Sequence, residues 1–229
     1  MNLNSTLQSL SPELVLSLAE TFIGQKEWDK ARISLLTFLD GMHSNWSPLS
    51  IGKDGKSSYA VWNKNEKDAL CKSVQQRVQT EQVQVNYVSY SKAMYLMGQI
   101  AIEEGKLDEA TTWNTRALEL ESDHPVLWIQ KGQINKLSRR FPSAFKAYKH
   151  ALNARPWQDN TTKAQAARGA GIVLAELNQP QAAIDMLQES LKLDPGNEHT
   201  MNELSGLYLE RSADIPAKSP KKSFWKRFR

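Results

Sequence analysis

The residues that come closest to a chemical motif lie in SIGKDGKS, where Gly55-Lys56-Ser57 matches the end of a phosphate-binding loop. The first glycine of such a loop would be residue 50, which is Ser50 here. What precedes the segment does not read as a strand, and SYAVW after it does not read as a helix. The amide nest and the helix N-terminus that hold phosphate are therefore not expected. We interpret the segment as a loop that binds no nucleotide.

The other groups that could ligate a metal or attack a substrate form no motif either. The single cysteine, Cys71, has no Cys-x-x-Cys partner. No metal-ligand spacing relates the four histidines, which are His43, His124, His150 and His199. The acidic pairs at 103–104 and 108–109 flank a predicted turn and helix start, where solvation and the helix dipole explain them better than acid–base catalysis. The sequence therefore predicts a protein that is not an enzyme and holds no metal or cofactor.

Positive charge is concentrated at one end of the chain. The whole protein has 29 Lys and Arg against 25 Asp and Glu, and six of the basic residues lie at 218–229. Without that segment the balance is 23 against 25, so net charge does not favour nucleic acid as a partner of the rest. The N-terminus lacks a secretory signal pattern, no apolar run approaches the ~20 residues of a membrane span, and one cysteine fits a reducing compartment. We expect a cytoplasmic protein.

Self-comparison of the sequence shows landmarks that recur every 34 residues. Gly98 and Gly132 are 34 residues apart, as are Ala110 and Ala144. A third copy carries Gly171, at a spacing lengthened by the five residues DNTTK. Within each copy, apolar residues follow the three- and four-residue spacing of a helix, with a break in the middle. Each copy therefore predicts two helices joined by a turn, and the small landmarks are the places where helices approach closely.

This unit resembles the tetratricopeptide repeat, whose pattern is a Trp, a Leu-Gly pair, a Tyr, and then Ala, an aromatic residue, Ala and Pro. The copy at 125–158 matches best, with Trp128, Gly132, Phe141, Ala144, Tyr148, Ala151 and Pro156 on the pattern. The copy at 91–124 lacks the final Pro, the copy at 164–197 ends in LKLDPGN, and a weaker copy covers 12–45. The resemblance implies an all-α fold, in which tetratricopeptide-type helix-turn-helix repeats form a right-handed superhelical solenoid with a flexible basic C-terminal tail.

The resemblance and the composition divide the chain into four parts. Residues 1–45 are an N-terminal helical pair, 46–90 an insertion, 91–211 the repeat stack with a capping helix at 198–211, and 212–229 a flexible linker and basic-aromatic tail. In the insertion, WSPLSIGKDGKSSYAVW reads as a loop and EKDALCKSVQQRVQ as a connecting helix. The segment QVQVNYVSY alternates like a strand but runs into the next repeat without a Gly or Pro. We favour a helical continuation there.

In this family the first helix of each repeat lines a concave groove that binds a partner protein or peptide. Carried onto this sequence, the lining positions are Lys92, Tyr95, Leu96, Gln99, Ile129, Gln130, Gln133, Lys136, Gln165, Arg168, Ile172, Glu176 and Asn202. Amides, aliphatic groups and a few cations suit an extended or helical peptide, because amides satisfy its backbone. Family members that grip a chaperone's C-terminal carboxylate use a Lys and an Asn where the first repeat here has Leu16 and Glu20. That mode of binding is not favoured.

The last residues are predicted to anchor the chain to another surface. In SFWKRFR one helical turn would place the three aromatic rings on one side and basic groups toward the other. The predicted anchor residues are Lys221, Lys222, Phe224, Trp225, Lys226, Arg227, Phe228 and Arg229. An anionic membrane attracts such a segment by about 1 kcal/mol per Lys or Arg; a docking site on a partner protein, nucleic acid, or no specific role are the alternatives.

Together these features predict a non-enzymatic scaffold or adaptor that binds a partner in its groove and assists assembly of a complex. Its tail would tether it to an anionic membrane surface, which for a cytoplasmic protein is the inner face, or to a partner. Two alternatives stay open. One is a nucleic-acid-associated protein that binds through the tail, and the other is a secretion-type repeat chaperone.

Overall fold

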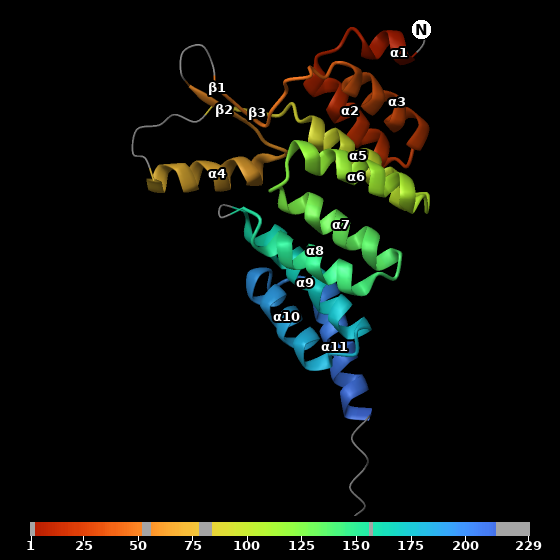
Figure 1. Cartoon of the computed structure of the whole chain (residues 1–229), viewed down its shortest axis with the longest axis vertical. Helices are drawn as coiled ribbons and strands as arrows, with labels where there is room; N and C mark the ends of the chain where they lie inside the picture. Colours follow the sequence, from red (N-terminus) through yellow and green to blue (C-terminus); the bar gives the residue numbers. More distant parts are fainter. Residues whose placement is uncertain (1–2, 52–55, 78–83, 156–157, 214–229) are drawn as a thin grey trace, which may run out of the picture.

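The computed structural model of the protein describes residues 3–51, 56–77, 84–155 and 158–213. Most of these residues form helix pairs that stack one on another into an elongated solenoid (Figure 1). The prediction of a helical repeat solenoid is therefore confirmed. The predicted tail anchor at 221–229 lies outside the described residues.

Each pair consists of two consecutive helices that pack against each other along their length. The pairs are α2 (Pro12–Gly24) with α3 (Trp28–Asp40), α5 (Tyr90–Glu103) with α6 (Leu107–Leu120), α7 (Pro125–Leu137) with α8 (Phe141–Leu152), and α9 (Asn160–Glu176) with α10 (Pro180–Leu193). A short helix, α1 (Leu3–Leu7), packs on α3 at one end, and α11 (Glu198–Ala213) packs on α10 at the other. The last helix lies where the sequence predicts a capping helix.

The turn inside each pair has the same backbone geometry. Its central residue has a positive φ, of 59° at Lys26, 74° at Gly105, 56° at Arg139 and 57° at Asn178. The next residue donates its N–H to a carbonyl five residues back, as from Lys106 to Ala101 at 2.8 Å. This left-handed residue ends a helix and satisfies carbonyl groups that would otherwise lack donors. The repeated turn keeps the pairs alike although their sequences differ.

The first helical pair belongs to the same stack as the later ones, although 46–90 separates them in sequence. Helix α3 packs on α5, and Arg32 on α3 donates hydrogen bonds to Glu104 and Glu109 at 2.5 and 2.6 Å. The hydrogen bond from Arg32 and the positive charge of its guanidinium group together outweigh burial. They hold the pKa of Glu109 below its ordinary value. The apolar core runs from α2 and α3 into α5 without a break.

The insertion contains a small sheet that the sequence analysis did not predict. Its strands are β1 (Leu49–Ile51), β2 (Ser57–Ala60) and β3 (Gln84–Asn86), in the order β1-β2-β3. Strand β1 pairs antiparallel with β2, and β3 pairs parallel with β2, with Val85 opposite Tyr59. Helix α4 (Lys64–Arg77) connects β2 to β3 and covers most of the predicted connecting helix.

Two expectations about the insertion are corrected. Residues 84–86 form a strand and do not continue a helix, because the alternation of QVQVN has period two and β2 offers its edge for pairing. The segment WSPLSIGKDGKSSYAVW, predicted as a loop, contains strands β1 and β2. No helix N-terminus follows Ser57, so the interpretation that this segment is no phosphate-binding loop does not change.

Candidate functional site

A groove runs across the first helices of the later repeats, and we call it the lower groove. Its volume is about 420 Å³, and it is lined by Gln99, Ile129, Gln133, Lys136, Tyr148, Gln165, Arg168, Gly169, Ile172, His199 and Glu203. Seven of these residues are predicted groove positions, which are Gln99, Ile129, Gln133, Lys136, Gln165, Arg168 and Ile172. Helices α5, α7 and α9 therefore bring more than half of the predicted set together.

A second cavity of about 700 Å³ adjoins the lower groove at the end of the stack. Two lining residues, Ile172 and Glu203, are shared between the two spaces. The predicted positions Glu176 and Asn202 line this second cavity, together with residues of α11 such as Leu207. The two spaces together thus extend from α5 to α11.

The lower groove combines cationic groups, amides and aliphatic groups. Lys136 and Arg168 supply positive charge on α7 and α9, while Glu203 on α11 supplies negative charge. Gln99 is half-buried, and its Oε1 atom is enclosed without a hydrogen-bond partner among the described residues. An enclosed acceptor is costly to leave unsatisfied, so this oxygen favours a donor brought by a partner or by water.

Tyr148 is a groove residue that the sequence analysis missed. It comes from α8, the second helix of its pair, and reaches the groove because Gly132 and Gly169 carry no side chain on the facing helices. Burial raises the pKa of Tyr148 to about 12, although the nearby charge of Arg168 acts in the opposite direction. Its hydroxyl stays protonated at neutral pH. The glycines, 37 residues apart around one tyrosine, were the available signal.

Three other lining residues were also missed. Gly169 lies beside Tyr148, and His199 and Glu203 come from α11. The last two residues could have been found by treating the capping helix as a complete first helix, because His199 and Glu203 are one turn apart on it.

Two predicted groove residues are buried in the core instead. Leu96 is 7% exposed and packs in the core between the first two helical pairs. Gln130 is 1% exposed, donates from Nε2 to the Tyr95 carbonyl at 2.9 Å, and accepts from Asn114 at 3.1 Å. Gln130 is therefore a polar link between neighbouring repeats, and its amide is not available to a partner. Both residues face the preceding repeat, since Leu96 packs with the first helical pair and Gln130 bonds to Tyr95 and Asn114.

The remaining two predicted positions, Lys92 and Tyr95, are covered by the insertion. The Trp62 ring lies 5.1 Å from the Tyr95 ring between centroids, and the Lys92 Nζ donates to the Trp62 carbonyl at 2.9 Å. Lys92 also pairs with Glu20 on α2 at 2.8 Å. The upper end of the predicted groove is thus filled by Trp62.

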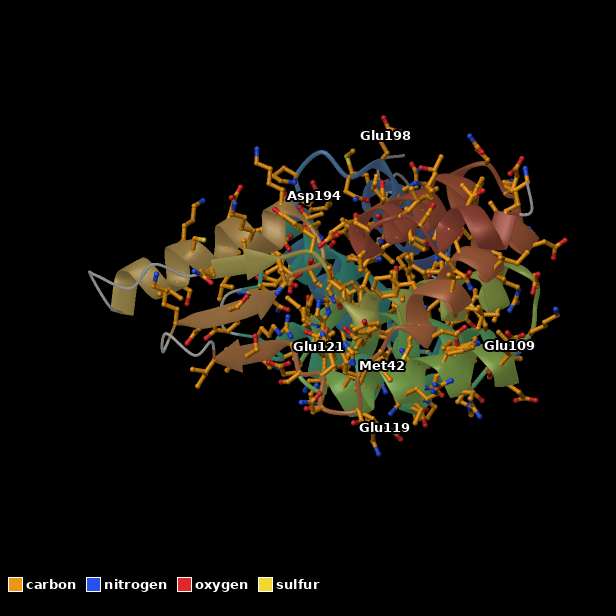
Figure 2. The ribbon with its side chains drawn as sticks, turned by 90° about the horizontal axis from the view of Figure 1, so that it is seen from above. Met42, Glu109, Glu119, Glu121, Asp194 and Glu198 are labelled. Carbon is orange, nitrogen blue, oxygen red and sulfur yellow. The ribbon has the colours of Figure 1, made fainter. Side chains whose placement is uncertain are left out.

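A buried ionic cluster joins the insertion to the repeats. Arg155, which follows α8, donates to Glu66 on α4 at 2.7 Å, to Glu121 at 2.9 Å and to Asp123 at 3.0 Å. Figure 2 places Glu121 between the insertion and the helices, whereas Glu109 lies on the far side of the stack. Arg155 therefore lies among three carboxylates that belong to two separate parts of the chain.

The protonation of Glu66 is set by its neighbours. Burial alone would raise its pKa, but the neighbouring His124 side chain, the charge of Arg155 and the backbone N–H of Trp62 together lower the pKa below its ordinary value. The Glu66 carboxylate is therefore ionised at neutral pH. Among the residues that the structure describes, no group of three or more His, Cys, Asp or Glu side chains is placed to hold a metal ion.

The fold and groove define a helical-repeat protein, and a family model matches one of its repeats. The family model described as tetratricopeptide repeat matches residues 91–124, the bounds predicted for the first copy in the main stack. Residues 91–124 therefore match a tetratricopeptide repeat, and the other helix pairs share its helix-turn-helix architecture. No curated protein matches its sequence.

Solved structures of low sequence identity share the fold. Pseudomonas aeruginosa PilF is 13% identical with a TM-score of 0.60, over 91% of this chain and 71% of PilF. The MamA protein is 12% identical with a TM-score of 0.53, over 88% of this chain and 82% of MamA. The Sgt2 repeat domain from Aspergillus fumigatus is 13% identical with a TM-score of 0.51, over 60% of this chain and 90% of that domain. At these identities the likeness concerns architecture alone.

Within residues 3–213, apart from the gaps in the description, none of the helices has both the length and the apolar character required to cross a bilayer.

Proposed function

We propose that the protein is a non-enzymatic scaffold that binds a peptide segment of a partner protein in the lower groove. The observation that carries this proposal is the row of amide and cationic side chains on α5, α7 and α9, with the Gln99 acceptor enclosed and lacking a partner among the described residues. A peptide backbone carries N–H and C=O groups in alternation, and a row of side-chain amides can accept from the first and donate to the second. The scaffold would assist the assembly of a complex that contains the partner.

Substitution of two groove residues tests this proposal. In a quantitative pull-down from lysate, Gln133→Ala combined with Arg168→Glu is expected to reduce capture of the partner at least about fivefold, because loss of an interface anchor costs about 1–2 kcal/mol. Lys146→Glu is the matched control, since Lys146 is exposed on α8 and does not line the groove. An unchanged set of captured proteins in the groove variant, with circular dichroism like that of the wild type, would refute the assignment.

The tail at 218–229 supports a second part of the proposal, a tether to an anionic membrane. Its six basic residues and three aromatic rings are the specific observation, and each Lys or Arg contributes about 1 kcal/mol near an anionic leaflet. The full chain is expected to float with vesicles that contain anionic lipid, and the chain truncated after 217 is not. Raising the salt concentration should release it, because the attraction is electrostatic.

Two controls separate the tether from other roles of the tail. Replacing Phe224, Trp225 and Phe228 with alanine keeps every charge. A loss of flotation relative to the unsubstituted full chain therefore measures insertion of the rings. Vesicles of neutral lipid should not bind the chain. Flotation that persists after truncation, or binding of single-stranded nucleic acid in place of lipid, would argue against the membrane tether.

A further inference from the structure

Trp62 is a large aromatic residue of the insertion, yet it is only 5% exposed and packs with residues of the repeat helices. Figure 1 shows the strands and α4 extending away from the stack. The segment from Trp62 to Glu66 lies at the junction of the two, since its contacts are with α5 and with the loops after α6 and α8. A short segment therefore carries the attachment of a projecting unit.

The repeats contact three different features of Trp62. Its ring stacks on His124 with centroids 3.8 Å apart and an interplanar angle of 21°. Its indole N–H donates to Glu121 at 3.2 Å, and its carbonyl accepts from Lys92 at 2.9 Å. Glu121 also accepts from Ser91, which orients the carboxylate toward the indole. Ring, indole nitrogen and backbone are thus each recognised by a separate group, as in a ligand pocket.

A second set of contacts recognises the carboxylate four residues later. Glu66 Oε1 lies 2.7 Å from Arg155 and 3.2 Å from His124 Nε2. The other carboxylate oxygen of Glu66 accepts from the backbone N–H of Trp62 at 2.6 Å. The backbone N–H of Glu66 donates to the Asn63 Oδ1 at 2.9 Å. The last two bonds lie within the segment and fix its shape as the start of α4. The segment therefore presents an aromatic ring and a carboxylate in one defined arrangement.

We propose that the pocket formed by Lys92, Tyr95, Glu121, His124 and Arg155 is a peptide-binding site for a segment with Trp and a carboxylate four residues later. In this chain its own Trp62–Glu66 segment occupies the site as a tethered ligand. The site is separate from the lower groove, because the two share no lining residue. A partner in the lower groove and the tethered segment can therefore be bound at the same time.

The tether explains why an external ligand would not bind the intact protein. A segment linked to its own site acts at an effective concentration of about 1 mM or more. A free peptide at micromolar concentration cannot compete with it. Removing the two recognised side chains from the tethered segment should empty the pocket without altering the residues that form it.

The test supplies the segment in trans. A fluorescein-labelled peptide of residues 58–68, SYAVWNKNEKD, is titrated into the full chain with Trp62→Ala and Glu66→Ala, and binding is measured by fluorescence anisotropy. The doubly substituted chain is expected to bind the peptide at least about tenfold more tightly than the wild type, whose site is already filled. A peptide in which the Trp is replaced by Ala should not bind. A chain with Asn65→Ala and Asp68→Ala is the matched control, since both residues are exposed in the same segment, and it should behave like the wild type.

A milder pair of substitutions guards against loss of folding. Trp62→Phe with Glu66→Gln keeps most of the volume of the segment but loses the indole donor and the carboxylate charge, so this chain should also gain peptide binding. Circular dichroism and a melting curve establish that the receptors are folded. The proposal is overturned if folded receptors of both kinds fail to bind the peptide, or if the wild type binds the peptide as tightly as these receptors do. Either result leaves the lower groove and its proposed function untouched.

Discussion

Replacing Arg155 with methionine is expected to lower the free energy of unfolding by about 3–5 kcal/mol, because it leaves buried carboxylates without a compensating charge. The Arg155 side chain is 6% exposed, and those of Glu66 and Glu121 are 10% and 0% exposed. Methionine approximates the length of the arginine stem but supplies neither charge nor donors. The measurement is equilibrium unfolding in urea, followed by circular dichroism at 222 nm.

A second variant shows whether the loss comes from uncompensated charge. Combining Arg155→Met with Glu66→Gln removes one carboxylate charge and should recover part of the stability. Lys192→Met is the control, since the Lys192–Glu189 pair is exposed by 74% and 46%, and such surface pairs contribute about 0–1 kcal/mol. An effect of Arg155→Met no larger than that of Lys192→Met would show that the cluster does not hold the insertion to the stack.

The repeat architecture could be predicted from sequence because its determinants are local. Helical spacing, the break in each copy and the small residues at the crossings all lie within 34 residues of one another. Buried Ala110, Ala144 and Ala183 have no exposed surface, as their positions in the repeats predict. The structure of the insertion was harder to predict, since the strand at 84–86 depends on an edge supplied by residues 58–60.

The contacts by which Trp62 fills the upper end of the predicted groove could not be predicted for a related reason. The Trp62–Glu121 hydrogen bond joins residues 59 apart in sequence, and the Glu66–Arg155 pair joins residues 89 apart. No periodicity relates an insertion to the repeats that it contacts. Family positions placed Lys92 and Tyr95 in the groove, but only the structure reveals that this chain covers them.

Gln130 shows a different limit of sequence reasoning. A glutamine on the first helix of a repeat is equally suited to a groove or to a buried link between repeats. Here Gly98 decides the outcome, because a Cβ at that position would lie 3.0 Å from Gln130 Nε2. The missing side chain on one repeat makes room for the amide of the next, so the two residues have to be read together.

The same reasoning applies with greater effect to Tyr148, whose ring lies between two helices at positions that carry glycine. A Cβ on Gly169 would lie 2.4 Å from the ring, and a Cβ on Gly132 would lie 2.7 Å from it. Both separations are far below van der Waals contact. Because glycine on each side defines the space, the ring cannot move away from one helix without meeting the other.

Gly169→Ala is therefore expected to lower the free energy of unfolding by about 2–3 kcal/mol, in the upper part of the range for overpacking. Helix propensity alone would predict the opposite sign, a gain of about 0.5–1 kcal/mol, and that gain is expected for the control Gly206→Ala, where a Cβ meets nothing within 4 Å. In a Tyr148→Ala background the penalty of Gly169→Ala should disappear, since the ring that it strikes is absent. Urea unfolding of the four chains gives the coupling free energy. If Gly169→Ala is as stable as the wild type, or costs the same with and without the tyrosine, the close contact does not constrain this part of the groove.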